Sequence, residues 1–318
     1  MLTRMGLRAL AVCCATALMT TLTSAPAHAG WTRSTSVVPG RYADAEVFRL
    51  PDGRYRMLYG TESEVPADRF GIYSSISRDG RTWRSEGRVL AGRFSGPDVV
   101  RLPGGGYRMY LNGSATTTTE TGTTTDFGVV SYTSVDGATW QPESGLRLPT
   151  SWLRAGERYG FTSTTRLSSG TWLMAYEVDR DGSYAPNVPS GLAQIRWATS
   201  SNGLTFTRRG VAVDSRNTLL LGGARSPEFF GGQLYFHSLK GIFKVTWKGN
   251  HFTRPAKLVL GSCRDPKKVF PWTPPPADPT LARIGSTTVM FHGDHTRGIF
   301  RTVLRGSAHS CFAGRFVR

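Results

Sequence analysis

The stretch GPDVVRLPGGGYRMYLNG, residues 96–113, decides the fold because the chain contains a close copy of it. The copy is ADAEVFRLPDGRYRMLYG, residues 43–60. Each version has an acidic residue before two apolar residues, then Arg-Leu-Pro, a glycine turn and Tyr-Arg-Met. Two apolar runs joined by a glycine turn predict a β-hairpin. Its duplication indicates an architecture built from internal repeats.

Three weaker copies follow, at residues 160–177, 225–238 and 277–293. Each complete unit continues with another strand, an Asp-Gly or Asn-Gly turn such as SRDG or SSNG, and an aromatic-led strand. Five such four-stranded antiparallel units predict an all-β, five-bladed β-propeller. A β-sandwich explains the five-fold recurrence less well. Aligning the apolar pairs of the five copies places these residues in one column: Glu46, Asp98, Ser163, Glu228 and Thr280.

The N-terminal segment is expected to close the ring. WTRSTSVVP, residues 31–39, is similar to the fourth strand TWRSEGRVL of the first unit, and the last unit has no clear fourth strand of its own. Closure of this kind covers the sheet edges that an open array would expose. The threonine-rich insert at residues 114–126 is expected to be a flexible surface loop.

Residues 1–29 have the features of a secretory signal peptide: Arg4 and Arg8, a short apolar run, and the ending APAHA. Cleavage after Ala29 would leave residues 30–318 as a single propeller domain, secreted and without a transmembrane anchor. We expect this domain to be a monomer.

Two cysteines, Cys263 and Cys311, remain after the leader. In an exported protein such an isolated pair predicts one disulfide, here flanking the fifth blade. Closing so long a loop would contribute about 4 kcal/mol in the chain-entropy model. No third or fourth ligand has suitable spacing, so we expect neither a metal site nor a cofactor.

The formal charge of +17 becomes +15 without the two leader arginines. Such a balance favours anionic partners such as acidic polysaccharide, phosphate-bearing wall polymer, membrane or nucleic acid, or else serves solubility. The basic residues are scattered and form no nucleic-acid motif, so nucleic acid is not expected.

In a propeller the first strand of each blade lines the central channel. The starts of the five repeated phrases should therefore meet around one axis. This places several carboxylates near one another: Asp44, Glu46, Asp98, Glu228 and Asp278. Clustered carboxylates raise one another's pKa values, which can yield one proton donor and one ionised partner. Glycoside hydrolysis requires such a pair.

The five units, with ADAEV, GPDVV and ADPTL at the inner strands and the SRDGRTW and SVDGATW turns, resemble the five-bladed glycoside hydrolases of the family-43-like arabinanase and β-xylosidase superfamily. The turns are also similar to sialidase Asp-boxes, one residue shorter. The resemblance implies that Asp44 is the general base, although Ala45 stands where the family has proline. The family's third-blade aspartate has no counterpart in RYGFTST. Arg225 stands near the place of its fourth-blade general acid, with Glu228 following the proline.

Three functions remain open. The first is a glycoside hydrolase acting on a polysaccharide or cell-wall glycan, in which Asp44 activates water or attacks the sugar, Glu228 protonates the leaving oxygen, and Asp98 orients the sugar or tunes its neighbours. The second is a non-catalytic carbohydrate- or wall-binding propeller. The third is structural: the acidic residues at the blade starts accept backbone N–H bonds and fix the inner strands. The enzymatic runner-up is a sialidase-like enzyme on an anionic sugar, gripped by Arg41, Arg158 and Arg225. The candidate substrate-binding residues are Arg41, Glu46, Arg158, Glu177, Arg225, His237, Trp272, Asp278 and His292.

Overall fold

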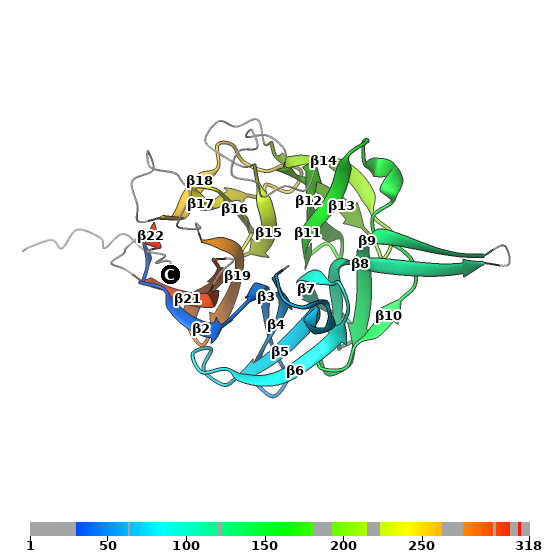
Figure 1. Cartoon of the computed structure of the whole chain (residues 1–318). Coiled ribbons are helices and arrows are strands. Elements are labelled where there is room, and N and C mark those ends of the chain that lie inside the picture. The colour runs from blue at the N-terminus through cyan, green and yellow to red at the C-terminus, as the bar shows by residue number, and fades with distance from the viewer. Residues whose placement is uncertain are drawn as a thin grey trace, which may run out of the picture.

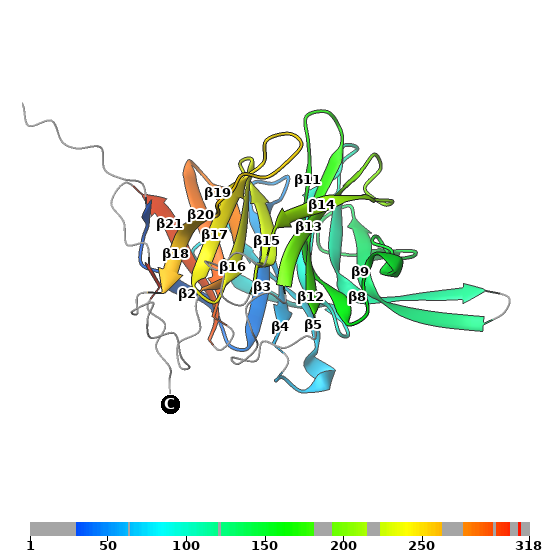
Figure 2. The same cartoon turned by 90° about the horizontal axis from the view of Figure 1, so that it is seen from above.

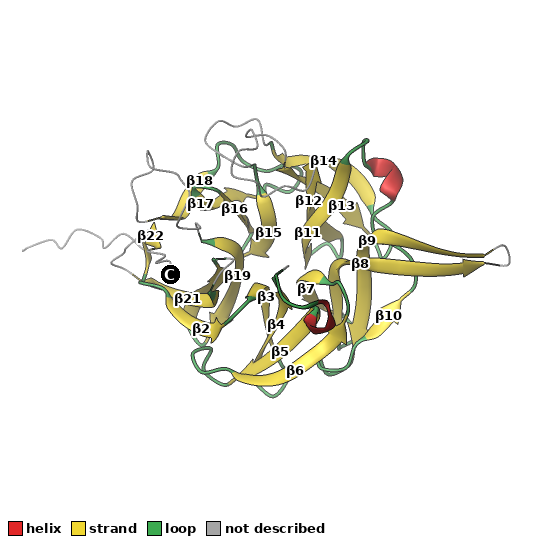
Figure 3. Ribbon diagram, in the orientation of Figure 1, coloured by secondary structure: helices red, strands yellow, loops and turns green. Residues whose placement is uncertain are grey.

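Five β-sheets stand around a central axis in the computed structural model, and strands make up most of the described chain (Figure 1, Figure 3). The structure describes residues 30–62, 64–119, 122–180, 193–214, 223–262, 276–294, 297–305 and 311–312. The predicted signal peptide therefore lies outside the described residues. The expected five-bladed propeller is confirmed.

The first three blades each contain four strands in sequential order. Blade one comprises β3 (Tyr42–Arg49), β4 (Tyr55–Thr61), β5 (Gly71–Ser77) and β6 (Arg84–Ala91). Blade two comprises β7 (Ser95–Arg101), β8 (Tyr107–Thr119), β9 (Gly122–Ser134) and β10 (Gln141–Glu143). Blade three comprises β11 (Glu157–Arg166), β12 (Trp172–Arg180), β13 (Ala193–Ser200) and β14 (Thr207–Val213). Short 3-10 helices lie at η1 (Ala67–Arg69) and η2 (Thr150–Trp152).

The last two blades receive strands from the two ends of the chain. Blade four comprises β15 (Arg225–Phe230), β16 (Gln233–Ser238), β17 (Gly241–Thr246) and β18 (Lys257–Ser262), with β22 (Cys311–Phe312) added in parallel to β18. Blade five comprises β19 (Ala277–Ile284), β20 (Thr287–Gly293) and β21 (Gly298–Arg305). Both β1 (Gly30–Trp31) and β2 (Thr35–Pro39) pair with β21, so the N-terminal segment closes the ring as expected.

The threonine-rich insert is not a loop over most of its length, which corrects the expectation from its composition. Strands β8 and β9 continue their ladder through it, from Ala115 opposite Asp126 to Thr119 opposite Gly122. Figure 2 shows this hairpin projecting well beyond its blade. Threonine is β-branched and therefore favours strands. The loop was expected from the low complexity of the segment, without regard to this preference.

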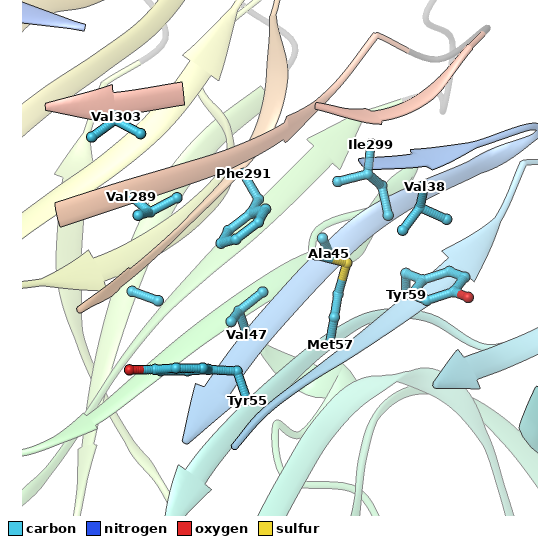
Figure 4. Packing of buried hydrophobic residues seen from close by; sticks show 11 residues of the cluster. Val38, Ala45, Val47, Tyr55, Met57, Tyr59, Val289, Phe291, Ile299 and Val303 are labelled. Atoms are coloured by element: carbon cyan, nitrogen blue, oxygen red, sulfur yellow. The ribbon is translucent and has the colours of Figure 1, made fainter. Parts of the chain in front are cut away.

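Apolar side chains fill the spaces between neighbouring blades. One cluster joins blades five and one, with Val47 and Met57 facing Phe291 and Ile299 (Figure 4). Four further clusters occupy the other blade junctions. Residues alternate between the two faces of a strand, so Met57 packs toward blade five while Leu58 packs toward blade two. The core is thus a ring of interfaces around the axis.

The Tyr-Arg-Met part of the repeated phrase also joins blades. Arg108 donates to Glu143 on the outer strand of its own blade and to the carbonyl of Asn202 in the next blade. Arg56 does the same with Glu86 and the carbonyl of Asp136. The acceptor carbonyls belong to the SVDG and SSNG turns. These repeated residues therefore have a structural role, because they connect neighbouring blades.

Candidate functional site

The five inner strands share an irregularity at their first ends. Each has a register shift where it begins to pair with the second strand of its blade. Three non-glycine residues there have positive φ: 55° at Asp44, 46° at Ser226 and 50° at Asp278. Gly96 takes the equivalent place in blade two, with φ of 61°. Such backbone conformations are costly outside glycine and concentrate at functional sites.

These first ends converge on one pocket on the propeller axis, which we call the axial pocket. The cavity itself is small, about 30 Å³, and it lies within a concave region of about 320 Å³ that includes open solvent. Its described polar lining includes the carboxylates of Asp44, Glu46, Glu228 and Asp278, and no described lining residue is basic. Ala45 and three prolines (Pro97, Pro227 and Pro279) supply apolar walls.

The five residues of the aligned column form a belt around the axis, and each side chain makes a hydrogen bond to the next blade. Glu46 accepts from the Val99 N–H of blade two at 3.4 Å. Asp98 accepts from the Thr164 N–H of blade three at 3.0 Å. Ser163 Oγ accepts from the Phe229 N–H of blade four, and Glu228 accepts from the Leu281 N–H of blade five. Thr280 Oγ1 lies within hydrogen-bond distance of both Glu46 and Glu228.

Burial raises the pKa values of the carboxyl groups in this belt. Desolvation raises the pKa of Glu228 to about 8, the Leu281 N–H opposes this, and the Asp98 charge adds to it. Desolvation likewise raises the pKa of Glu46 well above its usual value, with Glu228 and Asp98 contributing. The pKa of Asp98 rises to about 7 through burial, although hydrogen bonds from Thr164 and Thr162 favour its anion. Protonated carboxyl groups are therefore available in this belt near neutral pH.

A second polar group borders the pocket where blades four and five meet. Ser226 Oγ donates to Asp278 Oδ1 at 2.7 Å, and the Asp278 N–H donates to His237 Nδ1 at 3.1 Å. An acceptor Nδ1 means that a neutral His237 carries its proton on Nε2. Both Asp278 and His237, predicted as substrate-binding residues, are buried beside the pocket.

Arg225 is held by two carboxylates of β12. Its Nη1 donates to Glu177 at 3.0 Å and to Asp179 at 3.1 Å, and all three side chains are buried. Glu177 also accepts the Ser226 N–H at 2.9 Å, which ties this ion-paired cluster to the pocket wall. Burial raises the pKa of Glu177, and the Arg225 charge opposes that rise. Arg158 reaches Asp179 from the exposed side at 3.4 Å.

The remaining candidates are dispersed. Arg41 is exposed and lies 3.8 Å from Glu64. His292 is fully buried, 2.8 Å from Ser34 of the N-terminal segment, and burial lowers its pKa to about 4. Trp272 lies outside the described residues. The three arginines considered for an anionic sugar are thus not gathered in the lining of the axial pocket.

Cys263, like Trp272, lies outside the described residues, so the disulfide stays a prediction. Its predicted partner Cys311 is in β22, opposite Gly261 of β18. The C-terminal strand therefore extends blade four, whereas we expected the bridge at the fifth-blade seam. Within the part of the chain that the structure describes, no three His, Cys, Asp or Glu residues gather as metal ligands. No helix among those residues is long and apolar enough to cross a membrane.

Sequence reasoning missed Phe161. This half-buried residue lines the pocket at the third-blade place equivalent to Asp44. A Cβ built on Gly96 would lie 2.0 Å from Phe161 Cδ1, so the ring packs directly over that glycine. The residue stands two positions before Ser163 in the aligned column, as Asp44 stands before Glu46. That spacing could have identified it.

Solved structures share this fold. A thermostable family-43 glycoside hydrolase matches with a TM-score of 0.60 at 14% identity, covering 90% of this chain and 100% of that chain. The GH43_1 enzyme from Xanthomonas citri complexed with xylotriose gives 0.55 at 13%, covering 85% and 89%. A protein of unknown function from Dyadobacter fermentans DSM 18053 gives 0.53 at 12%, covering 87% and 99%. No family model and no curated protein matches the sequence. The chain has the propeller fold of the family-43 glycoside hydrolases.

Proposed function

We propose that this chain is a secreted glycoside hydrolase that cleaves a polysaccharide or cell-wall glycan in the axial pocket. The observation that carries the proposal is the convergence of Asp44 and Glu228 on one pocket in a fold shared with solved glycoside hydrolases. One of those neighbours was solved with xylotriose, which supports a carbohydrate ligand here.

In this proposal the two carboxyl groups have different tasks. Glu228 has a pKa of about 8, so it holds a proton at neutral pH and can donate it to the leaving oxygen. Asp44 is only half-buried at the pocket, where it can activate water or attack the sugar. Asp98 is buried behind them, and its charge helps to keep Glu228 protonated. No cofactor is required for this chemistry.

A second candidate, a non-catalytic carbohydrate-binding propeller, is favoured by Arg225. This residue stands near the place where the family resemblance puts a general acid, and its charge is already balanced by Glu177 and Asp179. Glu228 in turn bonds two neighbouring blades, so it has a structural task even without catalysis.

The deciding experiment is a panel of polysaccharides (arabinan, xylan, mannan and acidic wall polymers) with the mature protein and its Asp44→Asn and Glu228→Gln variants. Hydrolysis that both substitutions abolish, in variants with unchanged circular dichroism, supports the enzyme. Asp52→Asn and Glu64→Gln are matched controls, because both carboxylates are exposed and lie outside the pocket lining. Binding without turnover, retained in the Asp44→Asn and Glu228→Gln variants, contradicts the enzyme and supports the carbohydrate-binding module.

A further inference from the structure

The second ends of the inner strands carry a repeated basic residue. The position three residues after the aligned column is arginine in four of the five blades: Arg49, Arg101, Arg166 and Arg283. The blade-four equivalent is Gly231. The four arginines are exposed, and none forms a salt bridge with any residue that the structure describes. We call them the arginine ring.

Strand geometry places the arginine ring around the axis, on the face opposite the axial pocket. The first ends of all five inner strands approach or line that pocket, so the second ends emerge together at the other mouth of the channel. Contacts between blades confirm that the second ends are neighbours. Tyr107 of blade two donates to the Arg49 carbonyl, and the Gly285 N–H of blade five donates to Tyr55 of blade one.

Cations outnumber carboxylates around the arginine ring. The four turns that follow these arginines contain one acidic residue, Asp52, and Arg54 already donates to it at 2.7 Å. The turns between the third and fourth strands reach the same face, and they add the cations Arg81 and Lys248 together with the exposed carboxylates Asp79 and Asp136. Burial lowers the pKa of Arg301 on β21, and the neighbouring Arg81 charge lowers it further, whereas the Asp79 charge raises it.

The two faces of the propeller therefore differ in charge around the axis. Carboxylates line the axial pocket, whereas guanidinium groups surround the opposite mouth. A guanidinium presents a planar fork that matches a pair of carboxylate oxygens. Several such forks on one face suit a polymer with repeated anionic groups better than a single small anion.

We infer that the arginine ring is a docking surface for a carboxylate-bearing polysaccharide, separate from the axial pocket. The charge alone indicates a polyanion. The choice of a polysaccharide over nucleic acid rests on two points, namely the expected export of the chain and the burial of two tyrosine rings that the structure describes at this mouth. Tyr55 and Tyr107 at this mouth are only 6% and 2% exposed, whereas proteins that bind single-stranded nucleic acid offer exposed aromatic rings.

The experiment uses the mature protein and polygalacturonate, with binding followed by titration calorimetry at about 0.15 M salt, where distant surface charges are screened. A ring variant, Arg49→Gln/Arg101→Gln/Arg166→Gln, is compared with a control variant that removes the same charge from exposed arginines elsewhere, Arg69→Gln/Arg93→Gln/Arg154→Gln. We expect the ring variant to bind about tenfold more weakly, as for the loss of three modest charge contacts, and the control to bind as the wild type does.

Three results would overturn the inference. Equal weakening in both variants means that net charge, not the ring, attracts the polymer. Absence of binding by the wild-type protein rules out the docking surface. Tighter, ring-dependent binding of duplex DNA or polyphosphate assigns the surface to another class of partner. Hydrolysis of the glycan panel is measured in parallel, so a failure of the proposed enzyme activity is distinguishable from a failure of docking.

Discussion

Glu46 and Glu228 share one hydroxyl: Thr280 Oγ1 lies 3.1 Å from a carboxyl oxygen of Glu46 and 3.3 Å from one of Glu228. A hydroxyl has a single proton to donate, so the two carboxyl groups compete for it. The arrangement joins blades one, four and five around the axis. Burial raises the pKa of both carboxyl groups and the charge of a neighbouring acid adds to each rise, whereas the Thr280 hydroxyl lowers both values.

The first prediction concerns pH. The folded-state pKa of Glu228, about 8, exceeds its usual 4.5, so the folded protein binds more protons than the unfolded chain between these values. Stability should therefore fall as pH rises from about 4.5 through 8. Glu228→Gln mimics the protonated acid and should flatten this part of the curve. Melting temperature measured against pH tests this, and an equally steep fall in the variant would contradict it.

The second prediction concerns Gly96 and Phe161. Gly96→Ala places a methyl group where the Phe161 ring lies, at a residue whose φ is already positive. We expect a loss of about 1–3 kcal/mol in stability and weaker glycan binding. Gly87→Ala is the matched control, because Gly87 also has positive φ but has no atom within 4 Å of the new methyl group. Denaturant unfolding and glycan titration should show the larger loss in Gly96→Ala. Equal losses would mean that backbone strain alone is responsible.

The third prediction concerns the repeated Tyr-Arg-Met. Arg108→Gln removes the charged partner of Glu143, which keeps only the Ser131 hydroxyl, and removes a bond to the next blade, so we expect a loss of about 2–3 kcal/mol. Chemical denaturation measures this loss. Arg54→Gln breaks an exposed ion pair within the equivalent phrase of blade one and should leave the unfolding curve unchanged. An unaffected Arg108→Gln variant would show that the blades hold together without this contact.

The fourth prediction concerns the N-terminal closure. Trp31 is 4% exposed and packs with Tyr235, Leu260 and Met290. Trp31→Ala should cost about 3–5 kcal/mol, as for other large buried aromatic residues. Trp31→Phe should recover part of this loss if packing is the cause. Thermal unfolding distinguishes the two variants, and similar melting temperatures for wild type and Trp31→Ala would contradict the structural role.

The fifth prediction is the disulfide. The mature protein under non-reducing conditions should yield a proteolytic peptide pair that joins Cys263 to Cys311. Loss of the bridge in Cys311→Ser should lower stability by about 4 kcal/mol, and Cys263→Ser should have the same effect because both remove one cross-link. Free thiols at both positions, detected by alkylation of the denatured protein, would rule out the bridge.

The fold was predictable because the repeat leaves a physical signature in the sequence. The column from Glu46 to Thr280 aligns five inner strands, and the structure confirms that these residues meet around one axis. The similarity of residues 31–39 to an outer strand correctly predicted the ring closure. The expectation that threonine-rich residues 114–126 form a loop was wrong. It relied on their low complexity, whereas β-branched threonine favours strands.

The candidate site was less accessible to sequence reasoning. Alignment brought Asp44, Glu228 and Asp278 together, but it could not show that Glu228 bonds two neighbouring blades or that Arg225 is balanced by Glu177 and Asp179. Those contacts depend on side-chain direction and on partners in other blades. Phe161 was also missed, although its place two residues before Ser163 in the aligned column could have identified it.

The pairing of β1 and β2 with β21 also bears on how the chain folds during synthesis. The first-made strands of the described chain wait for a partner that lies about 270 residues later. Contacts of such sequence separation make folding slow. Until β21 is synthesised, blade five cannot be completed and the sheet edges at the seam stay open.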